Sequence, residues 1–151
     1  MGRGRLVAGE TGGPVRDTIK AVLEADTELV ATLTGGVYTE TISRQRTPDA
    51  FDAHGEIQPC ALIRVERDAQ HGPFTGTDAL SARTYVVVYA YQLAGYSSID
   101  TALNRVRVLL HRSRLGAGTW DISWADDSAD LEDEGLRCAM RFSRYVVTRK
   151  C

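Results

Sequence analysis

Residues 82–110, ARTYVVVYAYQLAGYSSIDTALNRVRVLL, carry the two patterns that decide the fold class. The first ten residues are rich in β-branched and aromatic side chains, which predicts a strand. From Ile99 onward apolar residues recur at steps of three and four, which predicts a helix with one buried stripe running on towards Gly116. Ser97 is placed to cap this helix, with Asp100 returning a hydrogen bond. The stretch therefore predicts a strand followed closely by an amphipathic helix.

A second amphipathic helix is predicted nearer the N-terminus. Apolar residues recur at helical spacing over residues 15–33, and Gly35-Gly36 closes the helix end because glycine readily adopts the left-handed conformation found there. The preceding residues are rich in glycine and have no period. We therefore expect a flexible arm over residues 1–13 and a single domain over residues 14–149.

Further strands are predicted on both sides of the opening stretch. Val37–Ile42 has strand composition and suits an edge. Cys60–Glu66 pairs with residues 82–91 as an antiparallel hairpin. In the C-terminal part, Trp120–Trp124 alternates strictly and places both indoles on one face, and the run from Leu136 to Phe142 alternates in the same way. The prediction is an α+β fold, with an antiparallel sheet of about four to five strands packed against two helices in the order α-β-β-β-α-β-β.

Two connections are candidates for contacts with other molecules. Residues 43–58 form a long polar segment, interpreted as an arm or interface loop, in which Arg44, Arg46 and Phe51 are candidate contact residues. With Arg64 and Arg67, the two arginines of this loop could form a basic patch. The hairpin tip at 71–77 offers His71 and Phe74 as contact residues, although a phenylalanine folded back onto the sheet is equally common.

Acidic residues are concentrated between the last two predicted strands, at Asp126, Asp127, Asp130 and Glu132. Their spacing does not match a calcium-binding loop, which needs oxygen ligands at alternate positions and a central glycine. A solvated turn fits this segment, as does a surface complementary to a basic neighbour. In a ring of identical subunits, unlike patches of adjacent copies face each other, so pairing with the basic loop is a further possibility.

Composition and motifs exclude several classes of function. The formal net charge is −2, which gives no overall electrostatic footprint for nucleic acid or an anionic membrane. No apolar run approaches the roughly 18 residues of a membrane span. Three widely spaced cysteines favour a reducing compartment such as the cytoplasm over a disulfide framework. Nucleophile, zinc-protease and phosphate-loop motifs are missing, so we expect neither an enzyme nor a cofactor or metal site.

The ordered elements resemble those of a known family, the tail terminator or tail completion proteins of long-tailed bacteriophages. The resemblance lies in VRDTIKAVLEADTELVATLTGGVYTE (residues 15–40), PCALIRVERD (59–68), the opening stretch, and the strand pair closing on RFSRYVV (141–147). It covers about residues 14–149 and consists of a pattern of elements, with no fixed catalytic motif.

The resemblance implies a structural virion protein assembled in the host cytoplasm. Members of this family form a ring, typically a hexamer, at the head-proximal end of the tail tube. The implied partners are further copies of the chain, the tail tube protein and the head–tail connector or stopper protein. DNA would pass through the ring without sequence-specific binding, and no membrane is involved.

Two other functions remain open at this point. A head completion or stopper protein of the same neck region is also small and ring-forming. A small ligand-binding or hydrolytic domain belongs to a different class, and it would need a pocket with convergent polar groups.

Overall fold

The computed structural model describes residues 12–71, 81–115 and 120–150. The helices are α1 (Gly12–Glu24), α2 (Thr27–Thr32) and α3 (Ser97–Leu110), with a short 3-10 helix η1 (Pro48–Ala50). The strands in chain order are β1 (Val37–Tyr38), β2 (Cys60–His71), β3 (Ser81–Gln92), β4 (Ser113–Leu115), β5 (Trp120–Asp127), β6 (Leu131–Asp133) and β7 (Cys138–Lys150).

All of these strands belong to one sheet. The strand order is β1-β2-β3-β7-β5-β4. β6 lies on the same side of β7 as β5: it pairs with residues 138–140 of β7, and β5 pairs with residues 143–149. Neighbouring strands are antiparallel except β1 and β2, which are parallel, with Val37 opposite Ala61. The antiparallel hairpin of β2 and β3 is confirmed. The prediction of four to five strands in a purely antiparallel sheet is wrong, because the described sheet has seven strands and is mixed.

The additional strands explain the difference in strand number. β4 and β6 have three residues each, too few to show an alternating pattern, and they are held by pairing with the longer β5 and β7. β1 is also shorter than the predicted strand over 37–42, since only Val37 and Tyr38 pair with β2.

The two faces of the sheet are covered differently. One face, here called the helix face, packs against α1, α2 and α3 around a core that includes Ile19, Ile63, Ile99 and Ile122. Trp120 and Trp124 lie on this face with Ile122, as predicted. The other face, here called the outer face, carries a smaller core at one end of the sheet.

The long loop from Thr39 to Pro59 builds this second core. It places Ile42, Ala50, Phe51 and Ile57 against side chains of the sheet, including Leu62. Each of these four loop residues is at most 8% exposed. The loop is therefore anchored on the sheet and is no detached arm.

The predicted N-terminal helix is broken into α1 and α2. Asp26 has extended backbone angles (φ −89°, ψ 115°), and its Oδ2 accepts a hydrogen bond from the Leu29 amide at 3.0 Å. The same carboxylate binds Arg105 of α3 at 2.7 Å. Aspartate stabilises a helix start by accepting such a hydrogen bond, so Asp26 begins a second helix where periodicity alone predicts a continuous one.

The start and end of α3 also differ from the prediction. Tyr96 is the N-cap residue and makes no side-chain cap. Instead, Gln92 Oε1 at the end of β3 accepts hydrogen bonds from the Ser98 and Ile99 amides, at 2.8 and 3.2 Å. Asp100 binds Arg141 of β7. The helix ends at Leu110, well before Gly116, because the chain turns directly into β4.

Candidate assembly surfaces

The loop from Thr39 to Pro59 presents two arginines to solvent. Thr47 Oγ1 donates to the Ser43 carbonyl and accepts from the Ser43 amide, both at 3.0 Å, which fixes the turn between them. Arg44 Nε donates to the Gly55 carbonyl at 2.8 Å. Arg46 is exposed. Among the described residues neither arginine forms an ion pair, so both guanidinium groups keep hydrogen-bonding capacity for a neighbouring molecule.

The aromatic candidate of this loop lies inside the chain. Phe51 is 8% exposed and belongs to the outer-face core. The Arg44 guanidinium lies 4.9 Å from the centre of its ring, which is within the range of a cation–π contact. The Phe51 ring thus packs against the Arg44 guanidinium and is too buried to contact a neighbouring molecule.

The candidates of the hairpin tip are largely beyond what the structure describes. His71 is the last residue of β2 and pairs with Ser81, and nothing is described of its side chain. Phe74 and most of the tip at 71–77 lie outside the described residues. Arg64 is exposed on β2, whereas the side chain of Arg67 is not described.

Three of the four acidic candidates bind arginines of their own chain. Asp126 binds Arg144 at 3.0 Å, and Arg144 also binds Glu66 at 3.1 Å. This triad links β5, β7 and β2 across the outer face. Asp130 lies 3.7 Å from Arg141, which also binds Asp100. Three of the six acidic residues over 126–134 are therefore paired with arginines of the part of the chain that the structure describes.

Asp127 has the most connected carboxylate of this segment. Its oxygens accept from Ser143 Oγ at 2.6 Å, from Trp124 Nε1 at 2.9 Å and from Arg107 at 2.5 Å. The Arg107 guanidinium also lies 4.0 Å from the Trp124 ring centre. Burial opposes ionisation, but the hydrogen bonds and the positive charges of Arg107 and Arg141 outweigh it and lower the pKa of Asp127. This network joins α3 to the sheet and has a structural role.

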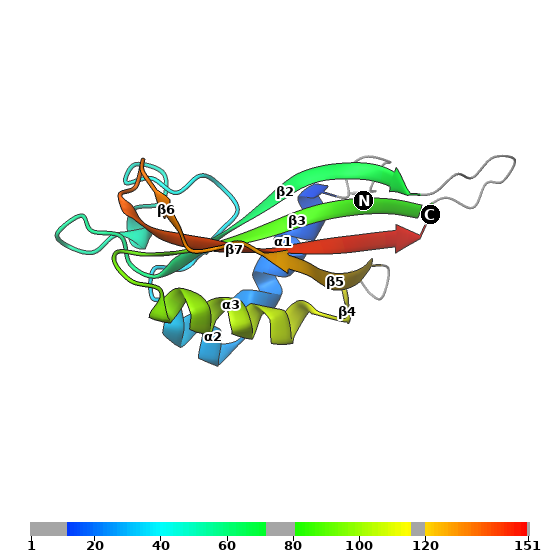
Figure 1. Cartoon of the computed structure of the whole chain (residues 1–151), viewed down its shortest axis with the longest axis horizontal. Coiled ribbons are helices and arrows are strands. Elements are labelled where there is room, and N and C mark those ends of the chain that lie inside the picture. The colour runs from blue at the N-terminus through cyan, green and yellow to red at the C-terminus, as the bar shows by residue number, and fades with distance from the viewer. Residues whose placement is uncertain (1–11, 72–80, 116–119, 151) are drawn as a thin grey trace, which may run out of the picture.

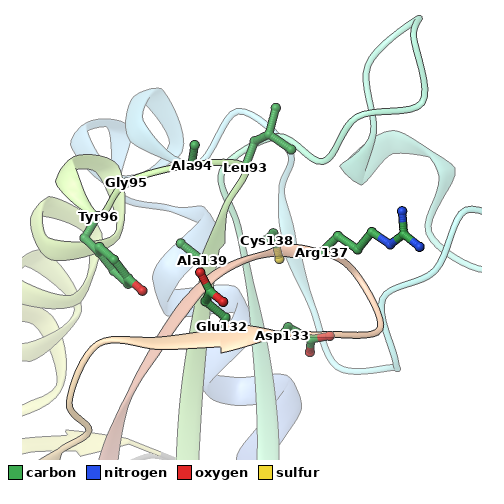
Figure 2. A pocket seen from close by; sticks show the side chains of 9 residues that line it. All are labelled: Leu93, Ala94, Gly95, Tyr96, Glu132, Asp133, Arg137, Cys138 and Ala139. Atoms are coloured by element: carbon green, nitrogen blue, oxygen red, sulfur yellow. The ribbon is translucent and has the colours of Figure 1, made fainter.

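The fourth acidic candidate, Glu132, lines a cleft of about 400 Å³. One side is the turn Leu93–Tyr96 between β3 and α3, the other is β6, and Cys138 and Ala139 of β7 also line it. Figure 2 shows the Glu132 side chain directed towards the turn and Arg137 directed away from it. Tyr96 donates its hydroxyl hydrogen to the Leu131 carbonyl at 2.7 Å, which ties the two sides together.

The chemical groups near the outer-face core are held in their neutral forms. Burial, with the nearby Cys60, Tyr89, Cys138 and Asp133, raises the pKa of Tyr91. Burial likewise raises the pKa of the Cys60 and Cys138 thiols to about 12. Over residues 12–71, 81–115 and 120–150, no group of three or more His, Cys, Asp or Glu side chains is arranged to hold a metal ion. Within the same ranges no helix combines the length and apolar character that a membrane span needs.

The cleft is the feature that sequence reasoning missed. It depends on Leu93 and Tyr96, which lie in a short turn, and on β6, which is too short to show a pattern. One signal was present: the apolar Leu93 stands between the end of the predicted strand and Gly95, a place where turns are usually polar.

Comparison with known proteins gives a match in fold. No protein-family model matches the chain, and no curated protein matches it. Among solved structures, the chain is similar to a chain of a structure described as the virion of a native gene transfer agent particle. The TM-score is 0.67 at 13% sequence identity, over 97% of this chain and 100% of the other. At that identity the likeness establishes a shared fold.

Proposed function

We propose that this chain is a structural protein of a phage-like virion, and specifically a tail terminator that forms a ring at the head-proximal end of the tail tube. The observation that carries this proposal is the likeness in fold to a component of a gene transfer agent virion, which covers nearly the whole of both chains. The resemblance of the ordered elements to tail terminators supports the narrower assignment. The ring would be a hexamer that ends tube growth and joins the tube to the head connector or stopper.

The positions of the charged surfaces support contacts between neighbouring copies. The loop from Thr39 to Pro59, here called the basic loop because it carries Arg44 and Arg46, lies at the same end of the sheet as the acidic segment around β6 (Figure 1). The loop belongs with β1 and β2 at one edge, whereas β6 pairs with the far side of β7. In a ring built from one repeated heterologous contact, opposite edges of adjacent copies face each other. Arg44 and Arg46 of one copy would then meet exposed carboxylates of the next, such as Asp130 and Glu134.

The same assignment gives expected roles to the β2–β3 hairpin and to the net charge of the chain. The hairpin of β2 and β3 runs, together with β7, to the end of the sheet opposite the long loop (Figure 1), and it would contact the tail tube or the adjacent subunit. The small net charge fits passage of DNA through the ring without sequence-specific binding.

A tube-length assay tests this proposal. Tail tube protein from the same virion is allowed to polymerise with increasing amounts of this chain, and tube lengths are measured in negative-stain images. A terminator shortens the tubes and occupies one end, at far fewer copies than tube subunits. Unchanged tube lengths with no chain bound at the ends would contradict the proposal.

A pair of variants tests the contact between copies. Arg44→Glu together with Arg46→Glu reverses the basic loop, and we expect the concentration needed for termination to rise about tenfold. Arg16→Glu on α1 changes charge away from the loop and is the control. Equal behaviour of the loop variant and the wild type would remove this loop from the interface.

A further inference from the structure

The cleft between the turn Leu93–Tyr96 and β6 combines an apolar border with an unpaired carboxylate. Two of the few exposed large hydrophobic residues described, Leu93 at 42% and Leu131 at 36%, lie at or beside it. Ala139 on its lining is 6% exposed and belongs to the helix-face core. The hydrogen bond from Tyr96 to the Leu131 carbonyl holds the two sides at a fixed separation.

The polar groups of the cleft select for a positive charge. Glu132 is exposed and forms no ion pair among the described residues. The Asp133 carboxylate already has a partner within the chain, since its Oδ1 accepts a hydrogen bond from the Leu136 amide at 2.8 Å. Arg137, the one basic residue of the lining, is directed away from the cleft (Figure 2). A ligand with an arginine next to an apolar side chain would fit this cleft, because the guanidinium would pair with the Glu132 carboxylate and the apolar side chain would cover Leu93 and Leu131.

The chain itself contains a segment of this chemistry, ahead of α1. Residues 1–11, MGRGRLVAGET, have Arg3 and Arg5 followed by Leu6 and Val7. This segment lies outside the described residues, and the structure begins with α1 at Gly12.

The direction of α1 argues against binding within the same copy. The C-terminal part of α1, with Lys20 and Glu24, lies beside Gly36 and Tyr38, next to β1 and the basic loop. The start of α1 therefore points away from the cleft end of the sheet (Figure 1). To reach β6, residues 1–11 would have to turn back along about 19 Å of helix. They would then have to cross about 14 Å of sheet from β2 to the far side of β7. Arg3 and Arg5 lie only nine and seven positions before Gly12, so a fully extended chain carries them at most about 32 and about 25 Å from it. The direct path is shorter than the sum of the two spans, and it still leaves the segment of the same copy little slack.

We propose that this cleft binds residues 1–11 of a second copy of the chain, with Arg3 or Arg5 on Glu132 and the adjacent apolar residues on Leu93 and Leu131. The inference rests on the proposed assembly of copies, to which it adds a second contact beside the basic loop. The occupant is a second copy because the segment is basic and apolar where the cleft is acidic and apolar, and because the segment of the same copy would have little slack.

A binding experiment with the full chain tests this inference without tail tubes. The receptor is the full-length chain carrying Arg3→Glu and Arg5→Glu, so that its own segment does not compete. The probe is a fluorescently labelled synthetic peptide of residues 1–11, and its anisotropy is followed as the receptor is added. We expect saturable binding that falls about tenfold when the receptor also carries Glu132→Lys.

Two controls decide the outcome. Glu56→Lys makes the same change of charge at an exposed position of the basic loop and should leave binding within about twofold. A peptide with Arg3 and Arg5 replaced by glutamate should not bind. Absence of saturable binding at up to about 1 mM receptor, or an equal loss in the Glu132 and Glu56 variants, would overturn the inference. Tube termination measured on the same preparations reports on the proposed function independently.

Discussion

Asp127 is the last residue of β5 and is partly exposed. Removing its carboxylate by Asp127→Ala should nevertheless destabilise the folded chain. Its side chain is 24% exposed and accepts hydrogen bonds from Ser143, Trp124 and Arg107. Ser143 is 0% exposed, so its hydroxyl would lose the Asp127 acceptor in a place that water does not reach. A buried polar group left without its partner costs about 1–3 kcal/mol.

The remaining contacts add less. The Arg107 side chain is 37% exposed, so its ion pair with Asp127 is screened and contributes about 0.5 kcal/mol. With the Trp124 hydrogen bond, the expected loss in free energy of unfolding is about 2–4 kcal/mol. Asp130→Ala is the matched control, because Asp130 is 67% exposed and its ion pair with Arg141 spans 3.7 Å. That variant should lose less than about 0.5 kcal/mol.

Urea unfolding, followed by circular dichroism and tryptophan fluorescence, measures both variants. Because the folded-state pKa of Asp127 is lowered from 3.8, its contribution is fully present above that value and is lost as the pH falls through the lower, folded pKa. The difference between wild type and Asp127→Ala should therefore shrink as the pH is lowered from about 5 to about 2. A loss below about 1 kcal/mol at neutral pH, or a difference that grows in acid, would refute the reasoning.

Three further predictions concern the outer-face core and the turn before β1. Phe51→Ala should lower the free energy of unfolding by about 3–5 kcal/mol, measured by urea titration, because the ring is 8% exposed in that core; a loss below about 0.5 kcal/mol would place it at the surface. Gly36→Ala should cost about 1–2 kcal/mol in the same assay, since the residue has φ 96° and a Cβ would lie 3.0 Å from the Tyr38 hydroxyl; an unchanged stability would contradict this strain. Cys60 and Cys138, whose pKa values are about 12, should resist iodoacetamide at pH 8 until the chain is unfolded, as checked by peptide mass mapping; rapid labelling of the folded chain would show that the core is open.

The predictable part of the fold is the part with long periodic segments. The hairpin of β2 and β3, the stripe of α3 and the shared face of Trp120 and Trp124 were all correctly predicted, because each extends over several repeats of its period. β4 and β6 have three residues each and depend on pairing with distant strands, which no local pattern reports. The break at Asp26 has a local cause, the cap on the Leu29 amide, which the continuous apolar period hides, whereas the contact with Arg105 far along the chain has no local signal.

The candidate surfaces divide in the same way. The exposure of Arg44 and Arg46 agrees with their polar loop, but the anchoring of that loop rests on apolar residues without regular spacing. From its sequence, the acidic segment is expected to be a solvated turn or a surface complementary to a basic neighbour. Asp127, Asp130 and Asp126 instead form ion pairs with Arg107, Arg141 and Arg144, in that order. These arginines come together only after α3 and β7 pack beside β5. The cleft also exists only once the turn after β3 lies beside β6.

The most direct measurement is cryo-electron microscopy of tail tubes incubated with this chain. The proposed function predicts one ring of six copies at a single end of each tube. In that ring the loop with Arg44 and Arg46 faces the β6 side of the adjacent copy. Tubes with bare ends, or density of this chain spread along their length, would contradict the assignment.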